Sequence, residues 1–408
     1  MTQSIHSVAM MTNLFPPLAT GSSIHSSTLA NKLVERGVAV TVFTAHVSKD
    51  APEHENMDGI DVYRLPCFKF PKLPIAVNFP WISMTMFPKN ISFMRKKLRE
   101  NNCQLIHVHN HMFDMALNGA YLANRLKLPL ALTIHSIIRH PNPFYNGVLG
   151  AIDATFLRYC MVSKADAVVD LDNSCTRYLA SRFGREDGTL IPLAIDLPQQ
   201  PSAADVDALR DKYQLHGKKV ILSVGHLHHL RNRLSLIRGF AKVLRTHPES
   251  RLIIIGARNY QPTLDLVAEL GLEKEVIFTG KQPHHLIPAF LKLCDLHSMW
   301  FDLDPEGRNS LANANIEAMF MGKPVMGMLD INAYGKGVLK DWENIVIIPH
   351  KDPEQHIAKA LVKLFDNPEL AETIGKNSQD LAQKTFNWDL VTDRHLALYS
   401  SLAGKEAQ

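Results

Sequence analysis

Short apolar runs alternate with longer segments of helical periodicity along both halves of this chain. The run Arg251–Ile255 is apolar on both faces, as a strand must be when helices cover both sides of its sheet. The segment 234–244 repeats its apolar residues at the 3.6-residue period of an amphipathic helix. Strands that alternate with helices form parallel sheets through βαβ units. The pattern therefore predicts an α/β fold with two doubly wound parallel sheets.

The two halves are separated by a polar stretch, 198–202, whose two prolines break both periodicities and indicate a linker. A length of 408 residues suits two domains of ordinary size, which we place at 1–197 and 198–387. The predicted strands of the first half are 7–11, 39–44, 105–109, 130–135, 167–171 and 189–191. Those of the second half are 219–224, 251–255, 275–279, 293–299, 324–328 and 345–348.

Composition and charge narrow the class of protein. Hydrophobic residues make up 46% and charged residues 21%, which is typical of a water-soluble globular chain. A net charge of +4 fits an anionic ligand or a membrane surface but is too small to indicate nucleic-acid binding. There is no signal-peptide pattern and no apolar run of membrane-spanning length, and the five cysteines are scattered singly. We therefore expect a cytoplasmic protein with no nucleic-acid partner.

The segment 309–324 carries the most specific motif and reads N-S-L-A-N-A-N-I-E-A-M-F-M-G-K-P. Small residues lead into a helix whose first turn, at Leu311, Ala312 and Asn313, offers backbone N–H groups and a positive dipole end to a phosphate. Glu317 lies further along this helix and can accept hydrogen bonds from the hydroxyls of a ribose. The motif therefore favours a nucleoside diphosphate as ligand.

Polar residues also follow the predicted strands of the first half. Gly21 and Ser22 follow the first strand, where a glycine permits a positive φ and a close approach of the backbone to a ligand, although a plain turn is an equal alternative. His107, His109 and His111 are two residues apart, so their side chains would lie on the same face of one strand. No nearby set of Cys or Asp residues completes a tetrahedral metal site with them. We therefore expect no metal at these histidines.

The sub-pattern E-A-M-x-x-G-K-P, which spans 317–324, resembles the nucleotide-sugar site of the retaining GT-B glycosyltransferases of family four. Weaker similarities follow in the same order along 13–399, such as L-T-x-H at 132–135 and V-G-x-L at 224–227. The resemblance implies the GT-B fold, in which two Rossmann-like domains face a central cleft. It also implies that a C-terminal helix, 388–408, packs back on the first domain.

The resemblance further implies retaining transfer of a hexosyl unit from a nucleotide-diphospho-sugar to the hydroxyl of a glycan, a lipid-linked or a small-molecule acceptor, without a cofactor or metal. His135, Asn309 and Arg231 take the catalytic positions, with His135 and Asn309 orienting the sugar. His109 and His111 take the acceptor side. The donor-binding positions are Gly21, Ser22, Gly225, His226, Arg231, Lys281, Leu311, Ala312, Asn313 and Glu317.

Two positions depart from the family pattern. Asn309 stands where the family usually has a glutamate, and His226 stands where it has an arginine. An amide can hydrogen-bond sugar hydroxyls but brings no charge, and a histidine is a weaker cation. Two alternatives therefore remain at this point. One is a nucleotide-sugar epimerase of the same fold, and the other is a non-catalytic protein that binds a sugar or nucleotide.

The segment 65–97 interleaves aromatic and basic residues. One interpretation is an irregular insertion whose aromatic side chains pack on the first domain. The other is an acceptor-binding or peripheral membrane-contact patch, because basic residues beside exposed aromatics favour anionic interfaces.

Overall fold

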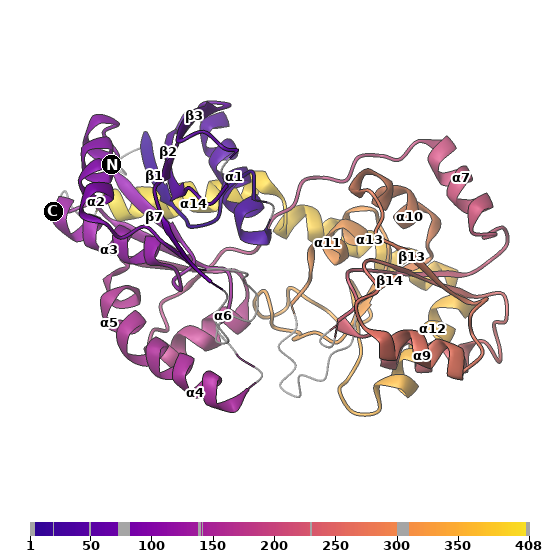
Figure 1. The fold of residues 1–408 in the computed structure, drawn as a ribbon. Coiled ribbons are helices and arrows are strands. Elements are labelled where there is room, and N and C mark those ends of the chain that lie inside the picture. The colour runs from indigo at the N-terminus through magenta and orange to yellow at the C-terminus, as the bar shows by residue number, and fades with distance from the viewer. Residues whose placement is uncertain are drawn as a thin grey trace. The chain divides into compact units, whose positions relative to one another are not determined.

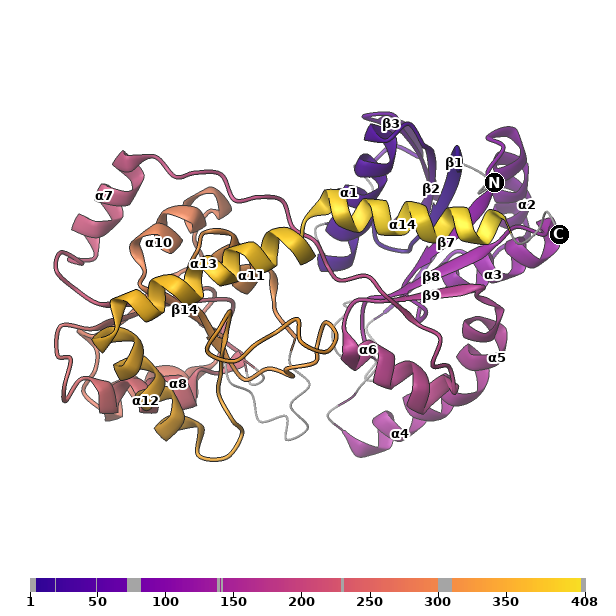
Figure 2. The same cartoon turned by 180° about the vertical axis from the view of Figure 1, so that it is seen from behind.

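The computed structural model describes residues 5–18, 20–48, 50–71, 82–137, 140, 142–228, 231–299 and 310–404. Its contacts divide the chain into two compact units, each built around its own sheet (Figures 1 and 2). Unit 1 comprises Met1–Ala194 and Trp388–Gln408, and unit 2 comprises Ile195–Asn387. Asn309 and the aromatic residues Phe79 and Trp81 lie outside the described residues.

The sheet of unit 1 has the strand order β10-β9-β8-β7-β1-β2-β4-β3 and is parallel except for β3. Its strands are β1 (Ser7–Met11), β2 (Ala39–Ala45), β3 (His54–Met57), β4 (Ile60–Leu65), β7 (Leu105–His109), β8 (Leu130–Ile134), β9 (Ala167–Asp170) and β10 (Thr189–Leu190). The order reverses between β1 and β7, because the chain adds β2 on one side of β1 and β7 on the other. Such a reversal is the usual ligand position in an open α/β sheet.

Helices cover both faces of this sheet, so the strands are apolar on both sides. Along β1, Val8 and Met10 enter one buried cluster, and Ala9 and Met11 enter the other. The helical segments of unit 1 are α1 (Gly21–Glu35), α2 (Pro88–Glu100), α3 (Asp114–Leu126), α4 (Pro143–Ile152), η1 (Asp153–Leu157), α5 (Arg158–Cys160), η2 (Val162–Lys164), α6 (Asn173–Tyr178), η3 (Leu179–Phe183) and α14 (Trp388–Ala403).

The C-terminal helix α14 packs beside α1 within unit 1 (Figure 2). Arg36, just after α1, forms ion pairs with Asp389 and Asp393 on α14. The hydroxyl of Tyr399 lies 2.7 Å from Nδ1 of His107 in β7, and both residues are fully buried. The last helix of the chain therefore completes the core built on its first strands.

Unit 2 has a fully parallel sheet of order β13-β12-β11-β14-β15-β16. Its strands are β11 (Val220–Val224), β12 (Arg251–Ile255), β13 (Val276–Gly280), β14 (Leu296–Ser298), β15 (Val325–Gly327) and β16 (Val346–Ile347). Its helical segments include α7 (Ala203–Lys212), α8 (Leu234–Val243), α9 (Gln261–Glu269), η5 (His284–Leu286), α10 (Ile287–Leu293), α11 (Asn313–Phe320), α12 (Pro353–Asp366) and α13 (Pro368–Thr385). This order reverses between β11 and β14.

Helices α8 and α12 approach each other closely on one face of the unit 2 sheet. A Cβ atom on Gly239 would lie only 2.7 Å from Cγ2 of Ile357. Phe240, Leu361 and Leu364 are buried in the cluster that these helices share with the sheet. A side chain at position 239 would therefore push α8 away from this core.

The predicted elements differ from the structure mainly at the first sheet's edge and in β14. Strand β4 lies between β2 and the antiparallel edge strand β3, and neither β3 nor β4 was predicted, because β3 is mostly polar and β4 carries charged residues among its apolar ones. The predicted strand 293–299 is shortened to Leu296–Ser298, because α10 continues through Leu293.

The segment 65–97 contains a short antiparallel pair, β5 (Phe68–Phe70) and β6 (Ile82–Met84), followed by α2. Phe68 exposes 53% of its surface and Phe93 exposes 37%. The insertion and the membrane-contact interpretations both stay predictions. Among the described helices, none combines the length and apolarity needed to cross a lipid bilayer.

A buried carboxyl group gives the first testable prediction. Asp170, at the end of β9, is fully buried, and neither carboxylate oxygen has a hydrogen-bond partner among the described residues. Burial raises the pKa of Asp170 to about 7. Because the folded state holds this proton more tightly than the unfolded state, stability falls as pH rises from about 4 to about 7 and then levels off.

Asp170→Asn removes this titration. Its unfolding free energy, relative to that of the wild type, should therefore rise across that pH window by up to roughly 4 kcal/mol. Urea unfolding of both proteins between pH 4.5 and 8 measures the difference. A difference that does not change with pH would contradict the assignment.

Candidate functional site

The predicted donor residues of unit 2 follow the two strands at which its order reverses. Gly225, His226 and Arg231 belong to the loop after β11, and α11 belongs to the connection that follows β14. Since both strands are parallel and adjacent, their following loops leave from the same edge of the sheet. The structure thus brings the phosphate-loop residues and the start of α11 to one edge of unit 2.

The loop after β11 approaches the loop after β12 closely. Gly225 has a φ of 139° and Gly256 a φ of 143°, a region that residues with a Cβ rarely adopt. A Cβ on Gly256 would lie 2.4 Å from the carbonyl oxygen of Gly225. The two glycines are therefore needed for this pair of turns.

Arg233 holds the same loop from inside, and sequence reasoning missed it. It is fully buried and donates hydrogen bonds to the carbonyl oxygens of Arg231 at 2.7 Å, Gly225 at 3.0 Å and His226 at 3.3 Å. Burial and the nearby charge of Arg231 lower the pKa of Arg233 to about 9, so its guanidinium stays charged at neutral pH. The signal in the sequence was the second arginine of R-N-R, which the family resemblance left unused.

His226 is exposed, and its Nδ1 accepts a hydrogen bond from the backbone N–H of Ala257 at 2.9 Å. An imidazole that accepts at Nδ1 carries its proton on Nε2 and is neutral. In this arrangement His226 can donate one hydrogen bond to a phosphate but cannot supply the charge of the family's arginine. Of the site residues predicted in this loop, Arg231 is therefore the one that brings a positive charge, and its side chain is partly exposed.

The start of α11 is fixed by side chains on both sides of it. The Tyr334 hydroxyl accepts from the Leu311 N–H at 3.0 Å, and Oδ1 of Asn315 accepts from the Ala312 N–H at 2.9 Å. Asn315 is itself buried and lies 3.2 Å from Nδ1 of His297 in β14. The next N–H groups, those of Asn313 and Ala314, belong to the helical turn that has no intrahelical acceptor.

Glu317 is one turn further along α11 and mostly shielded, with 14% of its side chain exposed. Its Oε1 lies 3.2 Å from Nε2 of His284, an exposed residue in η5. Lys281, exposed, precedes η5 in the same connection after β13. A ribose that binds Glu317 would therefore share this carboxylate with His284 or displace it.

Gly21 and Ser22 open α1, after the first strand of unit 1. Gly21 does not use the positive φ that a glycine permits, because its φ lies outside the left-handed region. Thr20 and Ser23 instead close a capping box, in which each side chain accepts from the other's N–H, so the turn is helical from Gly21 onward. A Cβ on Gly21 would meet no atom within 4 Å, which leaves open space beside this backbone.

The structure brings His109 and His135 together at the ends of β7 and β8. Nδ1 of His109 lies 3.0 Å from Nε2 of His135. Burial lowers the pKa of both rings, in His135 to about 3, so both are neutral at pH 7. His109 is fully buried, whereas His135 is partly exposed.

The first and third histidines of the H-x-H-x-H run make different contacts, although the ring of His107 also packs against that of His109, with centroids 4.2 Å apart. Nε2 of His111 lies 3.1 Å from the hydroxyl of buried Tyr178, and the His111 ring is fully buried. Nε2 of His107 lies 2.8 Å from the Thr133 hydroxyl, and its Nδ1 contacts Tyr399. Both rings are therefore packed in the buried core. An acceptor could reach His111 only by displacing buried side chains.

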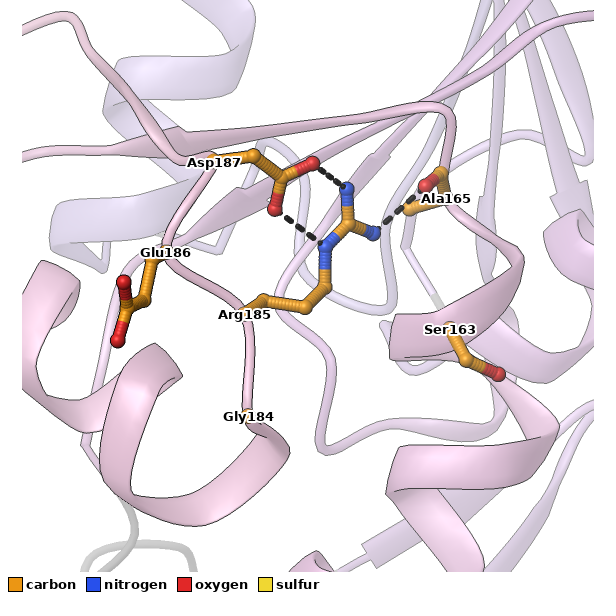
Figure 3. A pocket seen from close by; sticks show the side chains of 6 residues that line it. All are labelled: Ser163, Ala165, Gly184, Arg185, Glu186 and Asp187. Carbon is orange, nitrogen blue, oxygen red and sulfur yellow. Dashed lines mark hydrogen bonds and ion pairs between the residues drawn. The ribbon is translucent and has the colours of Figure 1, made fainter.

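A cavity of about 690 Å³ in unit 1 lies elsewhere, lined by Ser163, Ala165, Gly184, Arg185, Glu186 and Asp187 (Figure 3). Arg185 forms a two-pronged ion pair with Asp187, at 2.9 and 2.7 Å. Its remaining donor contacts the carbonyl oxygens of Val162 and Ala165. Because Asp187 neutralises this cation, the cavity offers little attraction for an anion, and none of the predicted site residues lines it.

Two family models together match nearly the whole chain. Residues 19–199 match the family model described as Glycosyltransferase Family 4, and residues 205–381 match Glycosyl transferases group 1. Alpha-D-kanosaminyltransferase of Streptomyces kanamyceticus is 26% identical over 76% of this chain and 80% of its own length. Mannosylfructose-phosphate synthase of Agrobacterium fabrum is 24% identical over 94% of this chain and 87% of its own.

Among solved structures, HepE of Anabaena in complex with UDP superposes with a TM-score of 0.71 at 18% identity, covering 98% of this chain and all of HepE. This likeness concerns the fold, and with the two Rossmann-like sheets it confirms the predicted GT-B class. The two consecutive family models cover most of the chain in the order expected from the motifs. The chain belongs to the family 4-like glycosyltransferases of group 1, which have the GT-B fold.

Proposed function

We propose that this glycosyltransferase moves a hexosyl unit from a nucleotide-diphospho-sugar to an acceptor hydroxyl, with retention of the anomeric configuration, in the synthesis of a glycan or glycoconjugate. We infer the class of the donor substrate from the residues at the edge of unit 2 where its strand order reverses. A cationic side chain, a glycine turn and the start of a helix meet there, followed by the shielded carboxylate of Glu317.

The diphosphate is the part of the donor that gains charge as the sugar departs. Arg231 can neutralise this charge with a forked guanidinium, and the N–H groups of Asn313 and Ala314 in the first turn of α11 can donate to phosphate oxygens. The predicted N–H donors of Leu311 and Ala312 are instead used within the protein, by Tyr334 and Asn315. The backbone that carries Arg231 and the first turn of α11 is held without any ligand, by Arg233 bonded to the carbonyl oxygen of Arg231 and by Tyr334 and Asn315 just before the helix. Preorganised donors of this kind stabilise a leaving group without a cost of reorganisation.

The remaining roles divide between the two units. In unit 2, Glu317 would hold the ribose hydroxyls, Lys281 would lie beside the base, and Asn309 would contact the sugar. In unit 1, His135 would orient the transferred sugar, and His109 would hold the ring of His135 from behind at 3.0 Å. HepE has been captured with UDP, which makes UDP the first nucleotide to test.

UDP should raise the midpoint of thermal unfolding of this protein, and Arg231→Ala should remove most of that rise. Loss of one charge-assisted hydrogen bond costs roughly 1.5–3 kcal/mol of binding free energy. Arg238→Ala is the matched control, because Arg238 lies on α8 and faces Glu354. Arg233→Gln should differ from both and lower the midpoint even without nucleotide. Equal UDP shifts in wild type and Arg231→Ala would reject the phosphate assignment.

Glu317→Ala should weaken UDP binding, because the substitution removes the proposed acceptor for the ribose hydroxyls. His135→Ala should leave UDP affinity unchanged and lower turnover with a nucleotide-sugar, because its ring is assigned to the sugar. Calorimetry with UDP, followed by a donor-consumption assay, separates the two effects. If both variants lose nucleotide affinity equally, the two roles have been confused. Tight UDP binding without turnover of any donor would favour the non-catalytic binding protein.

Asn309→Ala should reduce sugar transfer and leave UDP affinity nearly intact, because this residue precedes the helix that receives the diphosphate. Asn309→Glu restores the family's residue and should change the rate or the donor preference, since it adds a charge beside the reacting carbon. Competing UDP-, GDP- and ADP-sugars, assayed with the wild type and both variants, provide the measurement. Wild-type transfer of every donor by Asn309→Ala would show that the motif has been aligned wrongly.

A further inference from the structure

Three histidines from three different elements meet at the edge of unit 1 where its strand order reverses. His25 lies in α1, His109 is the last residue of β7, and His135 follows β8. One ring nitrogen of each lies within 4.8 Å of the other two. Of these three, His25 has no part in the function proposed above.

The environment of His25 is unusual for a buried imidazole. The residue is 2% exposed, and neither Nδ1 nor Nε2 has a hydrogen-bond partner among the described residues. Its ring packs edge-on against His135, with centroids 5.0 Å apart, and lies 5.2 Å from the Trp388 ring. A buried polar group without a hydrogen-bond partner destabilises the folded state. If this position only filled space in the core, an apolar side chain would stabilise the fold more than a histidine does.

His109 also has a ring nitrogen that is available to a ligand. Its Nδ1 lies beside His135, but its Nε2 is buried and has no partner among the described residues. His135 is partly exposed, so the cluster is open to solvent at one ring. Burial keeps all three imidazoles neutral at pH 7, the state in which a ring nitrogen binds metal.

We propose that His25, His109 and His135 form a binding site for a divalent d-block cation, with Zn²⁺ as the best-suited ion. Imidazole nitrogens suit Zn²⁺, Cu²⁺ and Ni²⁺, whereas Mg²⁺ and Ca²⁺ prefer oxygen ligands. Three protein ligands leave one position of a tetrahedral ion for water.

This site is distinct from a cofactor of the transfer reaction. An ion bound there would hold a nitrogen of His135, the ring assigned above to the transferred sugar. Metal and sugar would then compete for the same side chain, and micromolar d-block ions would inhibit the enzyme. The binding site itself does not rest on the proposed function, because its test measures only the metal.

The test uses the full chain without a histidine tag, freed of metal by a chelator. Zn²⁺ is titrated by calorimetry, and Co²⁺ by the visible absorption that reports a tetrahedral site. The wild type should bind one equivalent of each ion at this site. His25→Met is the informative variant, because His25 makes no hydrogen bond with the described part of the chain whose loss would leave a partner unsatisfied, and Met fills a similar buried space.

His25→Met should weaken Zn²⁺ binding at least about tenfold and abolish the tetrahedral Co²⁺ spectrum. His135→Ala, at the partly exposed ring, should do the same and guards against a folding defect in the first variant. His54→Ala is the control, since His54 is a surface histidine beside Asp61 and should bind metal only adventitiously. If all variants bind Zn²⁺ like the wild type, or if the wild type binds none, the site does not exist.

Discussion

The arrangement of this protein depends on a constraint of open parallel sheets. Where the chain adds its next strands to opposite sides of a central strand, the following loops separate and leave room at the carboxyl edge. This happens between β1 and β7 in unit 1 and between β11 and β14 in unit 2. The exposed or partly exposed polar side chains discussed above, such as His226, Arg231 and His135, follow these strands or their neighbours. Polar residues within the strands, such as His107 and His297, are buried and contact other buried groups.

At each edge, buried polar side chains hold the loops in place. In unit 2, Arg233 is surrounded by loop carbonyls, and Asn315 joins the start of α11 to His297 in β14. A charged guanidinium is stable inside the protein only because several carbonyl oxygens replace its water. The backbone of the predicted site residues, such as Arg231, is thus supported by a second set of residues that no ligand needs to touch. Substitutions in that set would alter function by way of loop geometry.

Much of the fold was predictable from the sequence, because buried parallel strands give continuous apolar runs. Strands β1, β7 and β12 have the predicted limits, and the positions of Gly225 and Glu317 followed from motifs. Strands β3 and β4 were not predicted, since the edge strand β3 is mostly polar and the inner strand β4 carries charged residues among its apolar ones. His25 and Arg233 were also missed. Their importance comes from burial and from neighbours distant in sequence, which neither period nor spacing reveals.

The position of α14 has a consequence for how the chain is made. Trp388, Val391, Tyr399 and Leu402 belong to the same buried cluster as the first strand, although more than 370 residues separate them from it in the sequence. During synthesis, the N-terminal sheet therefore emerges without one layer of its core, while unit 2 emerges whole before α14. Unit 2 can mature first, and unit 1 stays incomplete until α14 has been synthesised. Chaperones that recognise exposed apolar surface would meet this protein chiefly through the half that is translated first.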